Sequence, residues 1–180
     1  MVGIQSQTSI NTFNVCTSIV LTYICGVKIE DAIQQKEFQN EYVKLAINLM
    51  YTSSSLNIHQ QRYFRQFGLT VPQYNILRIL RGQKENPIGV NNLSGRMIDQ
   101  TSNTSRLVEK LRIKGLVDRQ VCESDRRQAE VRITQKGLDL LEAIDVTISD
   151  VDNLFKGLNK EEAAQLNDLL DKLRSGDAFQ

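Results

Sequence analysis

The sequence predicts a mainly helical (α+β) protein in which a helix-turn-helix and one β-hairpin lie between two long helical segments. Three observations support this fold class. Apolar residues recur at helical spacing toward both ends of the chain, and 180 residues include only two prolines. Two short helical patterns meet at a tight turn near residues 98–100. Two segments that alternate between apolar and polar residues follow, which is typical of half-buried strands.

Composition and charge exclude a disordered or collagen-like chain and indicate one basic region. The chain is 41% hydrophobic and 24% charged, as in ordinary globular domains. Its net charge is only +1, but residues 78–136 hold 13 basic and 7 acidic side chains, whereas residues 137–180 hold 4 basic and 10 acidic ones. A basic block within a nearly neutral chain is typical of a surface that binds a polyanion, although a run of charge is also common on any solvated face.

Cysteine and histidine usage argues against several kinds of chemistry. Cys16, Cys25 and Cys122 have no C-x-x-C spacing, so neither a disulfide framework nor a four-ligand zinc site is expected. We expect reduced thiols, a cytoplasmic location, and no metal or cofactor. The single histidine excludes catalysis by a histidine pair within one chain.

Residues 1–29 are assigned to an N-terminal extension without a predicted role. Their apolar run over residues 15–27 is thirteen residues long, whereas a membrane-spanning helix needs about 20. No Lys or Arg precedes the run, so it lacks the basic start of a signal peptide. We therefore expect no membrane partner.

Residues 30–68 are predicted to form an N-terminal dimerisation helix. The helix would cover residues 30–66 and end at Gly68, and its apolar stripe comprises Phe38, Tyr42, Leu45, Leu49, Leu56 and Tyr63. A helix of about 35 residues is roughly 50 Å long. A small monomer cannot cover such a length, so part of the stripe is expected to meet another chain.

A helix-turn-helix is predicted to begin with a helix capped by Thr70, with Pro72 in its first turn and Gly82 at its end. A short extended bridge at residues 88–89 and a short helix over residues 90–97 come next. Thr101 is expected to cap the second helix, which runs to residue 114 and stops at Gly115. Its predicted inward face comprises Thr104, Leu107, Val108 and Leu111.

A β-hairpin directly follows, with strands over residues 116–122 and 129–133. Its tip carries the basic sequence Ser124-Asp125-Arg126-Arg127. A helix-turn-helix followed by a basic hairpin is a winged helix-turn-helix, which we assign to residues 69–136.

Residues 137–180 are assigned to C-terminal dimerisation helices. Thr134 is the expected cap of a long helix that ends at Gly157, and its stripe comprises Leu138, Leu141, Ile144, Ile148, Val151 and Phe155. A last helix is predicted from about residue 160 to residue 174, where acidic residues suit its first turn.

The segments TSRLVEKLRIKGLVDR (104–119) and SDRRQAEVRITQKG (124–137) resemble the MarR family of bacterial winged-helix regulators. The resemblance covers residues 32–174, and the matching positions are Leu107, Leu111, Gly115, Leu116, Val117, Arg119, Asp125, Arg127, Thr134 and Gly137. It implies a homodimer with intertwined terminal helices that binds a pseudo-palindromic DNA duplex. It also implies a role in transcriptional regulation. We expect the protein to repress nearby genes and a small-molecule effector to relieve this repression.

The second helix of the helix-turn-helix is expected to enter the major groove. Asn103 is the residue type that pairs with adenine, and Arg106 the type that pairs with guanine. The expected DNA-binding residues of this helix are Ser102, Asn103, Ser105, Arg106 and Lys110.

The hairpin tip is expected to contact the flanking minor groove, where a narrow groove attracts arginine. The resemblance favours Arg127 over Arg126 as the inserted side chain, while Asp125 would orient a neighbouring arginine. Predicted phosphate contacts, which position a protein without reading sequence, are Arg78, Arg96, Arg112 and Lys136, with Arg81 and Lys84 as further candidates.

The effector pocket implied by the resemblance is predicted at His59, Tyr63, Phe67 and Tyr74, with Phe64 beside them, and would suit a small aromatic or phenolic compound. Aromatic residues at helical spacing equally fit a packed core, and a cysteine switch is an alternative form of regulation. Two other functions stay open. One is a winged-helix module that binds proteins, against which the cationic wing argues. The other is an enzyme, against which the lack of a catalytic cluster argues.

Overall fold

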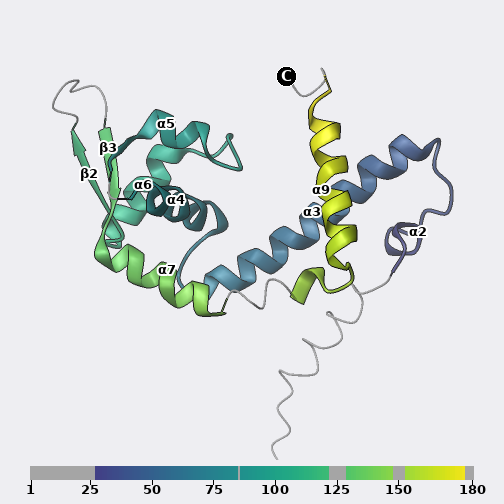
Figure 1. Cartoon of the computed structure of the whole chain (residues 1–180), viewed down its shortest axis with the longest axis horizontal. Helices are drawn as coiled ribbons and strands as arrows, with labels where there is room; N and C mark the ends of the chain where they lie inside the picture. Colours follow the sequence, from purple (N-terminus) through teal and green to yellow (C-terminus); the bar gives the residue numbers. More distant parts are fainter. Residues whose placement is uncertain (1–26, 85, 122–128, 148–152, 177–180) are drawn as a thin grey trace, which may run out of the picture. The chain divides into compact units, whose positions relative to one another are not determined.

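The computed structural model describes residues 27–84, 86–121, 129–147 and 153–176, and it confirms a mainly helical protein with one small antiparallel sheet (Figure 1). The chain divides into two compact units. One unit is formed by the residues up to 48 and from 153 onward, and the other by residues 49–152. None of the helices within the described ranges is long and apolar enough to cross a membrane.

The second unit is a winged helix-turn-helix. Its elements follow the order helix, strand, two helices, hairpin and helix: α4 (Val71–Gly82), β1 (Ile88–Gly89), α5 (Val90–Gly95), α6 (Thr104–Ile113), β2 (Val117–Val121), β3 (Ala129–Ile133) and α7 (Gln135–Thr147). The C-terminal part of α3 (Glu41–Arg65) also belongs to this unit. The predicted strands and the short bridge at residues 88–89 are therefore confirmed.

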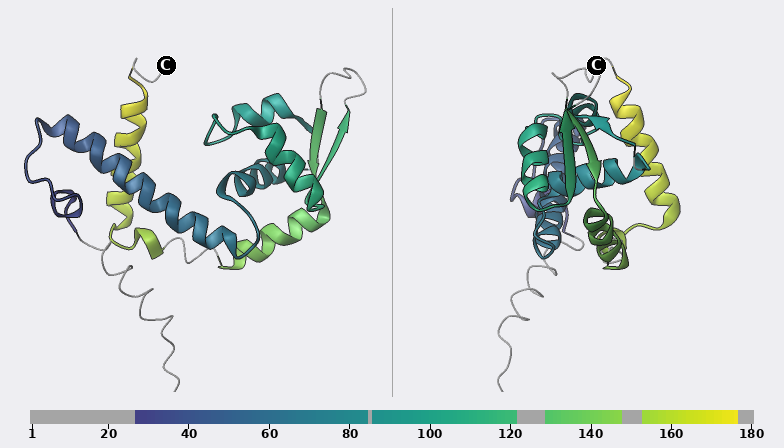
Figure 2. Two further views of the ribbon diagram at one scale, coloured as in Figure 1. Left: turned by 180° about the vertical axis from the view of Figure 1, so that it is seen from behind. Right: turned by 90° about the vertical axis from the view of Figure 1, so that its left-hand side faces the viewer.

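The sheet has the order β1-β3-β2, with both pairs antiparallel. Val131 in the central strand lies opposite Ile88 on one side and Arg119 on the other. Figure 2 shows β2 and β3 as two neighbouring arrows. The strands thus carry the chain away from the end of α6 and back to the start of α7.

The apolar core of this unit lies between its helices and the sheet. Its fully buried side chains come from α4, α5, α6, both hairpin strands and α7: Ile76, Leu77, Leu80, Leu93, Val108, Leu111, Val117, Val131, Leu141 and Ile144. Burying one such aliphatic side chain stabilises a fold by about 1.5–3 kcal/mol relative to its exposure. This core therefore fixes the position of α6.

The ends of these helices follow their sequence signals closely. Thr70 caps α4 in a reciprocal box with Gln73, and the Thr134 hydroxyl accepts a hydrogen bond from Gly137 N at the start of α7. Gly68 and Gly115 have φ of 68° and 71°, so both occupy the left-handed region that favours glycine. Gly82 is instead the last residue of α4, and Lys84 takes the left-handed conformation (φ 48°) in the loop.

The first unit contains α2 (Ile29–Ala32), the start of α3, a 3₁₀ turn η1 (Asn153–Phe155) and α9 (Lys160–Arg174). Among its described residues only Ile29 is a buried hydrophobic, and an ion pair joins Lys44 Nζ to Glu30 Oε1 at 2.6 Å. The predicted last helix is confirmed, and Asn159 and Glu162 form its capping box.

Two predicted helix extents are wrong. Residues 30–66 do not form one helix, because the chain leaves helical geometry after Ala32, Gln34 adopts a left-handed φ of 56°, and Asn40 Oδ1 accepts from Val43 N to start α3. The helix after Thr134 ends at Thr147, and Phe155 lies in η1. The predicted stripe residues Ile148 and Val151 lie outside the described ranges.

Candidate nucleic-acid interface

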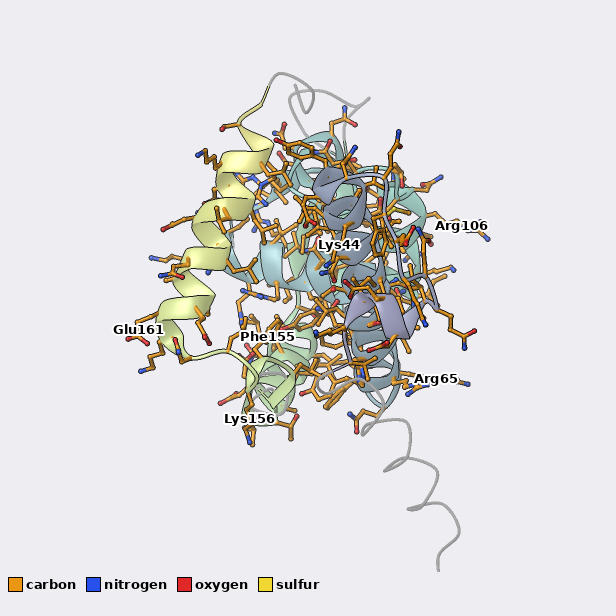
Figure 3. The ribbon with its side chains drawn as sticks, turned by 90° about the vertical axis from the view of Figure 1, so that its right-hand side faces the viewer. Lys44, Arg65, Arg106, Phe155, Lys156 and Glu161 are labelled. Carbon is orange, nitrogen blue, oxygen red and sulfur yellow. The ribbon has the colours of Figure 1, made fainter. Side chains whose placement is uncertain are left out.

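Helix α6 is held with one face in the core and the other in solvent. Of the predicted inward face, Thr104, Val108 and Leu111 are buried, and Leu107 is half-buried against the core. Ser105, Arg106 and Lys110 are exposed. Arg106 and Lys110 are four residues apart, so they project from the same side of the helix. Figure 3 shows the Arg106 side chain extended away from the ribbon.

The helix begins later than its sequence predicts. Asn103, not Thr101, is the N-cap, because its Oδ1 accepts a hydrogen bond from Arg106 N at 3.0 Å and the helix runs over Thr104–Ile113. Ser102 and Asn103 therefore lie in the turn before α6. The side-chain oxygen of Asn103 accepts this hydrogen bond, and its NH₂ group remains as a hydrogen-bond donor.

Asp99 organises this turn, and sequence reasoning missed it. Its Oδ1 accepts from the Thr101 hydroxyl at 2.6 Å and from Thr101 N at 3.0 Å, and its Oδ2 accepts from the Ser102 hydroxyl at 2.8 Å. The hydrogen bonds from Thr101 and then from Ser102 lower the pKa of the Asp99 carboxyl below its ordinary value. The sequence did hold a signal for this role, because Asp99 precedes Thr101 and Ser102 in a tight turn. In such turns an aspartate side chain commonly accepts a hydrogen bond from the backbone N–H two residues later.

A shallow hollow of about 230 Å³ lies beside the exposed face of α6. It is lined by Ser102, Asn103, Arg106, Leu107 and Lys110. Four of the five residues predicted to read DNA therefore surround one concave surface, and the fifth, Ser105, is exposed on the same helix. Hydroxyl, amide, guanidinium and ammonium groups together offer the donors that base edges and phosphates accept.

The predicted phosphate contacts lie in different surroundings. Arg78 on α4 and Arg96 after α5 are exposed. Arg112 instead donates two hydrogen bonds to the Glu109 carboxylate, at 3.0 and 2.8 Å. This bidentate interaction holds the pKa of the Glu109 carboxyl below its usual value. Lys136 Nζ donates to Lys114 O at 2.9 Å. That these four side chains contact phosphates stays a prediction.

Residues of the hairpin tip fall outside the described ranges. Asp125, Arg126 and Arg127, together with Cys122, belong to the segment between β2 and β3. The prediction that Arg127 enters a minor groove therefore stays a prediction.

The aromatic residues predicted to line an effector pocket pack against one another. The Phe64 and Tyr74 rings are stacked with centroids 4.0 Å apart, and Tyr63 meets Phe67 edge-on at 5.5 Å. The Tyr63 hydroxyl donates to Ile144 O at 3.1 Å and lies 2.7 Å from Thr147 Oγ1, and burial raises the pKa of the Tyr74 phenol. These contacts favour the alternative of a packed core. His59 is half-buried on α3.

A helix-turn-helix with a two-stranded wing and an exposed cationic second helix defines a winged helix-turn-helix protein. The MarR family model matches residues 69–129 of the chain. The HTH-type transcriptional repressor IacR of Pseudomonas putida is 31% identical over 114 residues, which are 63% of this chain and 67% of that protein. The HTH-type transcriptional regulator MhqR of Bacillus subtilis is 25% identical over 132 residues, or 73% of this chain and 90% of the relative.

Solved structures share the fold. A mutant of MarR from E. coli, crystallised with operator DNA, has a TM-score of 0.67 at 23% identity and covers 77% of this chain and 99% of its own. A MarR transcription factor from Planctomyces limnophilus has a TM-score of 0.58 at 26% identity, with 78% and 100% covered. The chain belongs to the MarR family and is a transcriptional regulator of the MarR type.

Proposed function

We propose that the chain represses transcription by binding a pseudo-palindromic operator as a cytoplasmic homodimer, and that a small-molecule effector releases it. The observation that carries this proposal is the exposed face of α6, which presents Arg106 and Lys110 beside Ser102 and Asn103. The buried face of the same helix holds these groups on a fixed support. A rigid support favours recognition, because less side-chain and backbone freedom is lost on binding.

Each side chain has a role in this proposal. Arg106 pairs with guanine through its planar fork, and the Asn103 NH₂ group donates to a base edge. Lys110, Arg78 and Arg96 neutralise phosphates and position the protein without reading sequence. At the hairpin tip, Arg127 enters the adjacent minor groove beside Arg126, and Asp125 orients a neighbouring arginine.

Unpartnered apolar surface supports the homodimer. Helix α3 has 25 residues, of which only Phe64 is buried, and α9 has no buried residue. Tyr42 and Met50 on α3 are 84% and 73% exposed, and Leu169 on α9 is 63% exposed. We assign residues 30–68 and 137–180 to dimerisation, since exposed apolar stripes of this kind mark interaction surfaces. Two copies of α6 would then read half-sites about 34–36 Å apart.

The names and structures of related proteins support the proposal that this chain acts on DNA. IacR and the E. coli protein MprA are named as transcriptional repressors, and MarR and the S. aureus protein MepR have been crystallised with DNA.

Selection of bound sequences from a random duplex pool, followed by fluorescence anisotropy on the selected site, tests the proposal. We expect a palindromic site and binding that weakens steeply as salt rises, because phosphate contacts release counterions. Arg106→Ala is expected to weaken binding by about 1–3 kcal/mol and to relax the preference at one position of each half-site.

Lys36→Ala is the matched control, since it removes one positive charge from the exposed segment between α2 and α3. It is expected to bind the selected site like the wild type. No enriched sequence, together with weak binding that Arg106→Ala leaves unchanged, would contradict the proposal and favour a winged helix that binds proteins.

A further inference from the structure

The turn before α6 contains a hydroxyl group whose hydrogen-bonding direction is fixed by the protein. Ser102 is half-buried and lines the hollow beside the exposed face of α6, together with Asn103 and Arg106. A free serine hydroxyl has one proton to donate and two lone pairs that accept. Whether the proton or a lone pair faces DNA decides which base edges the side chain can recognise.

The proton of the Ser102 hydroxyl is already used within the turn. It is donated to Asp99 Oδ2 at 2.8 Å. At neutral pH the Asp99 carboxyl is ionised, because the hydrogen bonds from Thr101 and Ser102 hold its pKa below the ordinary value of 3.8. An ionised carboxylate accepts hydrogen bonds and cannot donate them, so the direction of this hydrogen bond cannot reverse.

The remaining contacts of the turn hold Asp99 and Ser102 together. Ser102 N donates to Asp99 O at 3.3 Å, and Thr101 donates to Asp99 Oδ1 through its backbone N and its hydroxyl, at 3.0 and 2.6 Å. From α4, Asn75 Oδ1 accepts a hydrogen bond from Ile98 N at 3.0 Å, which ties the turn to the core unit. Turning the Asp99 carboxylate away from Ser102 would therefore break hydrogen bonds on both carboxylate oxygens.

The Ser102 oxygen keeps its acceptor side for a ligand. Among the residues that the structure describes, none donates a hydrogen bond to Ser102 Oγ. Donation to a carboxylate also strengthens this oxygen as an acceptor, because linked hydrogen bonds polarise one another. In the major groove adenine and cytosine present amino groups that donate, whereas guanine and thymine present only acceptors. Ser102 therefore suits adenine or cytosine and would face guanine or thymine with two acceptors opposed.

Asn103, the next residue, has the opposite polarity. Its Oδ1 accepts from Arg106 N at 3.0 Å, so its NH₂ group remains to donate. Asn103 and Ser102 line the same hollow. The turn thus offers one acceptor and one donor side by side, which is a defined pattern rather than a general attraction for acceptors.

We propose that Ser102 reads the amino group of an adenine or a cytosine in each half-site, and that Asp99 is the positioning residue that makes Ser102 an acceptor. Ser102 touches the base, whereas Asp99 acts through Ser102. A carboxylate is repelled by phosphates, so orienting a neighbour is the role that suits Asp99 on this surface. The assignment rests on the proposed function, because it takes the exposed face of α6 to read the operator.

A nuclear magnetic resonance titration of the Asp99 carboxyl in the full chain, without DNA, tests the contact between the two side chains. In Ser102→Ala one donor is lost, so the pKa of Asp99 is expected to rise toward 3.8 while the hydrogen bonds from Thr101 remain. Ser94→Ala removes the hydroxyl of a half-buried serine on α5 and is expected to leave the pKa of Asp99 unchanged. An Asp99 pKa that is the same in Ser102→Ala and in the wild type would overturn the inference.

Fluorescence anisotropy on single-base variants of the selected duplex tests the base preference. At one position of each half-site, adenine or cytosine is expected to bind the wild type about fivefold more tightly, or better, than guanine or thymine. In Ser102→Ala the affinities for the four bases at this position are expected to agree within about twofold. A Ser102→Ala variant that keeps every base preference of the wild type would overturn the inference.

Asp99→Asn distinguishes the polarity of Ser102 from its presence. The asparagine oxygen can still accept from Thr101, so the turn is kept, while the NH₂ group donates to Ser102 Oγ and frees the hydroxyl proton for DNA. The preference at the same position is then expected to change to guanine or thymine. A role of Asp99 in folding alone would instead weaken binding to all four bases equally.

Asp118→Asn is the matched control, because it makes the same chemical change at an exposed position of β2. It is expected to keep the base preference of the wild type. A selected site at which Asp99→Asn leaves the preference unchanged, or loses affinity for all four bases equally, would overturn the inference while the proposed function stands. If the wild type enriches no site, the proposed function is contradicted and the base assignment falls with it.

Discussion

At the scale of single residues, the turn before α6 depends on one carboxylate. Asp99 is exposed and accepts three hydrogen bonds from Thr101 and Ser102. The same turn holds Ser102 and Asn103 beside Arg106, so its geometry decides how the exposed face of α6 is presented. A carboxylate that accepts several hydrogen bonds favours its charged form, which explains the lowered pKa of Asp99.

Asp99→Ala is expected to destabilise the protein in a pH-dependent manner. The pKa of Asp99 in the folded state is below the ordinary value of 3.8, so its contribution is fully present above pH 3.8. As the pH falls below 3.8 toward the lower folded-state pKa, the unfolded chain takes up a proton first and the contribution is lost. Urea denaturation midpoints at several pH values measure this, and the gap between wild type and variant should close in acid.

Asp168→Ala is the control for this prediction, because Asp168 is an exposed carboxylate on α9. Its midpoint should follow the wild type at neutral pH. A gap for Asp99→Ala that stays constant from neutral to acid pH would show that the carboxylate charge is not responsible.

At the scale of elements, the winged unit depends on the close approach of α7 to the hairpin. A Cβ atom on Gly137 would lie 2.4 Å from Leu116 O and 2.7 Å from Ile133 Cγ1. Glycine is therefore required by the packing of the first turn of α7 against the start and end of the hairpin, since backbone cannot move aside cheaply. This close packing explains why glycine stands at position 137, four residues after the end of β3.

Gly137→Ala is expected to lower the free energy of unfolding by about 1–3 kcal/mol, as overpacking of a tight site does. Gly82→Ala is the matched control, because a Cβ at Gly82 meets no atom within 4 Å in the last turn of α4. There alanine is expected to stabilise the protein by up to about 1 kcal/mol. Urea titrations of both variants check the opposite signs, and equal effects would contradict the packing argument.

The order of the helices and strands could be predicted from the sequence, but some of the residues at which helices begin and end could not. Apolar spacing and N-cap residues locate α4, α6, α9 and the hairpin, because burial and capping depend on local residue types. The break between α2 and α3 was missed, since Phe38 and Tyr42 continue a helical spacing across residues that are not helical. Thr101 and Asn103 are both good cap residues, and only the hydrogen bond that Arg106 N donates to Asn103 Oδ1 distinguishes them.

The candidate site, too, could be predicted from the sequence only in part. Arg106 and Lys110 could be placed on an exposed face from periodicity alone, because Thr104, Val108 and Leu111 define the opposite face. That Arg65, Gln73 and Lys114 line one hollow could not be predicted, since these residues come from three segments that share no motif. Aromatic spacing in α3 cannot by itself distinguish a ligand site from the ring stack of Phe64 and Tyr74.

At the scale of the whole molecule, the exposed apolar side chains of α3 and α9 support the proposed homodimer. On α9, Leu166, Leu169 and Leu173 are 44%, 63% and 38% exposed. They lie within about one sixth of the helix circumference at roughly 100° per residue. In a symmetric dimer the same surface of both subunits meets at the interface, so an apolar stripe of this kind would be buried against its copy in the second subunit.

Leu169→Glu is expected to shift the protein from dimer to monomer in sedimentation velocity runs, because a buried unpaired charge would be costly at an interface. Ala164→Glu is the control: it adds the same charge on the opposite side of α9, where Ala164 is exposed. It should remain dimeric. A wild-type protein that sediments as a monomer at micromolar concentration would contradict the assignment of these segments to dimerisation.

The layout of the sheet has a consequence for how the protein behaves at high concentration. The central strand β3 is paired on both sides, so the outer edges belong to β1, which has only two residues, and to β2, which carries exposed Asp118 and Arg119. Short or charged edge strands are poor templates for strands of other molecules. The sheet is therefore protected against edge-to-edge aggregation while the hairpin still projects from the domain.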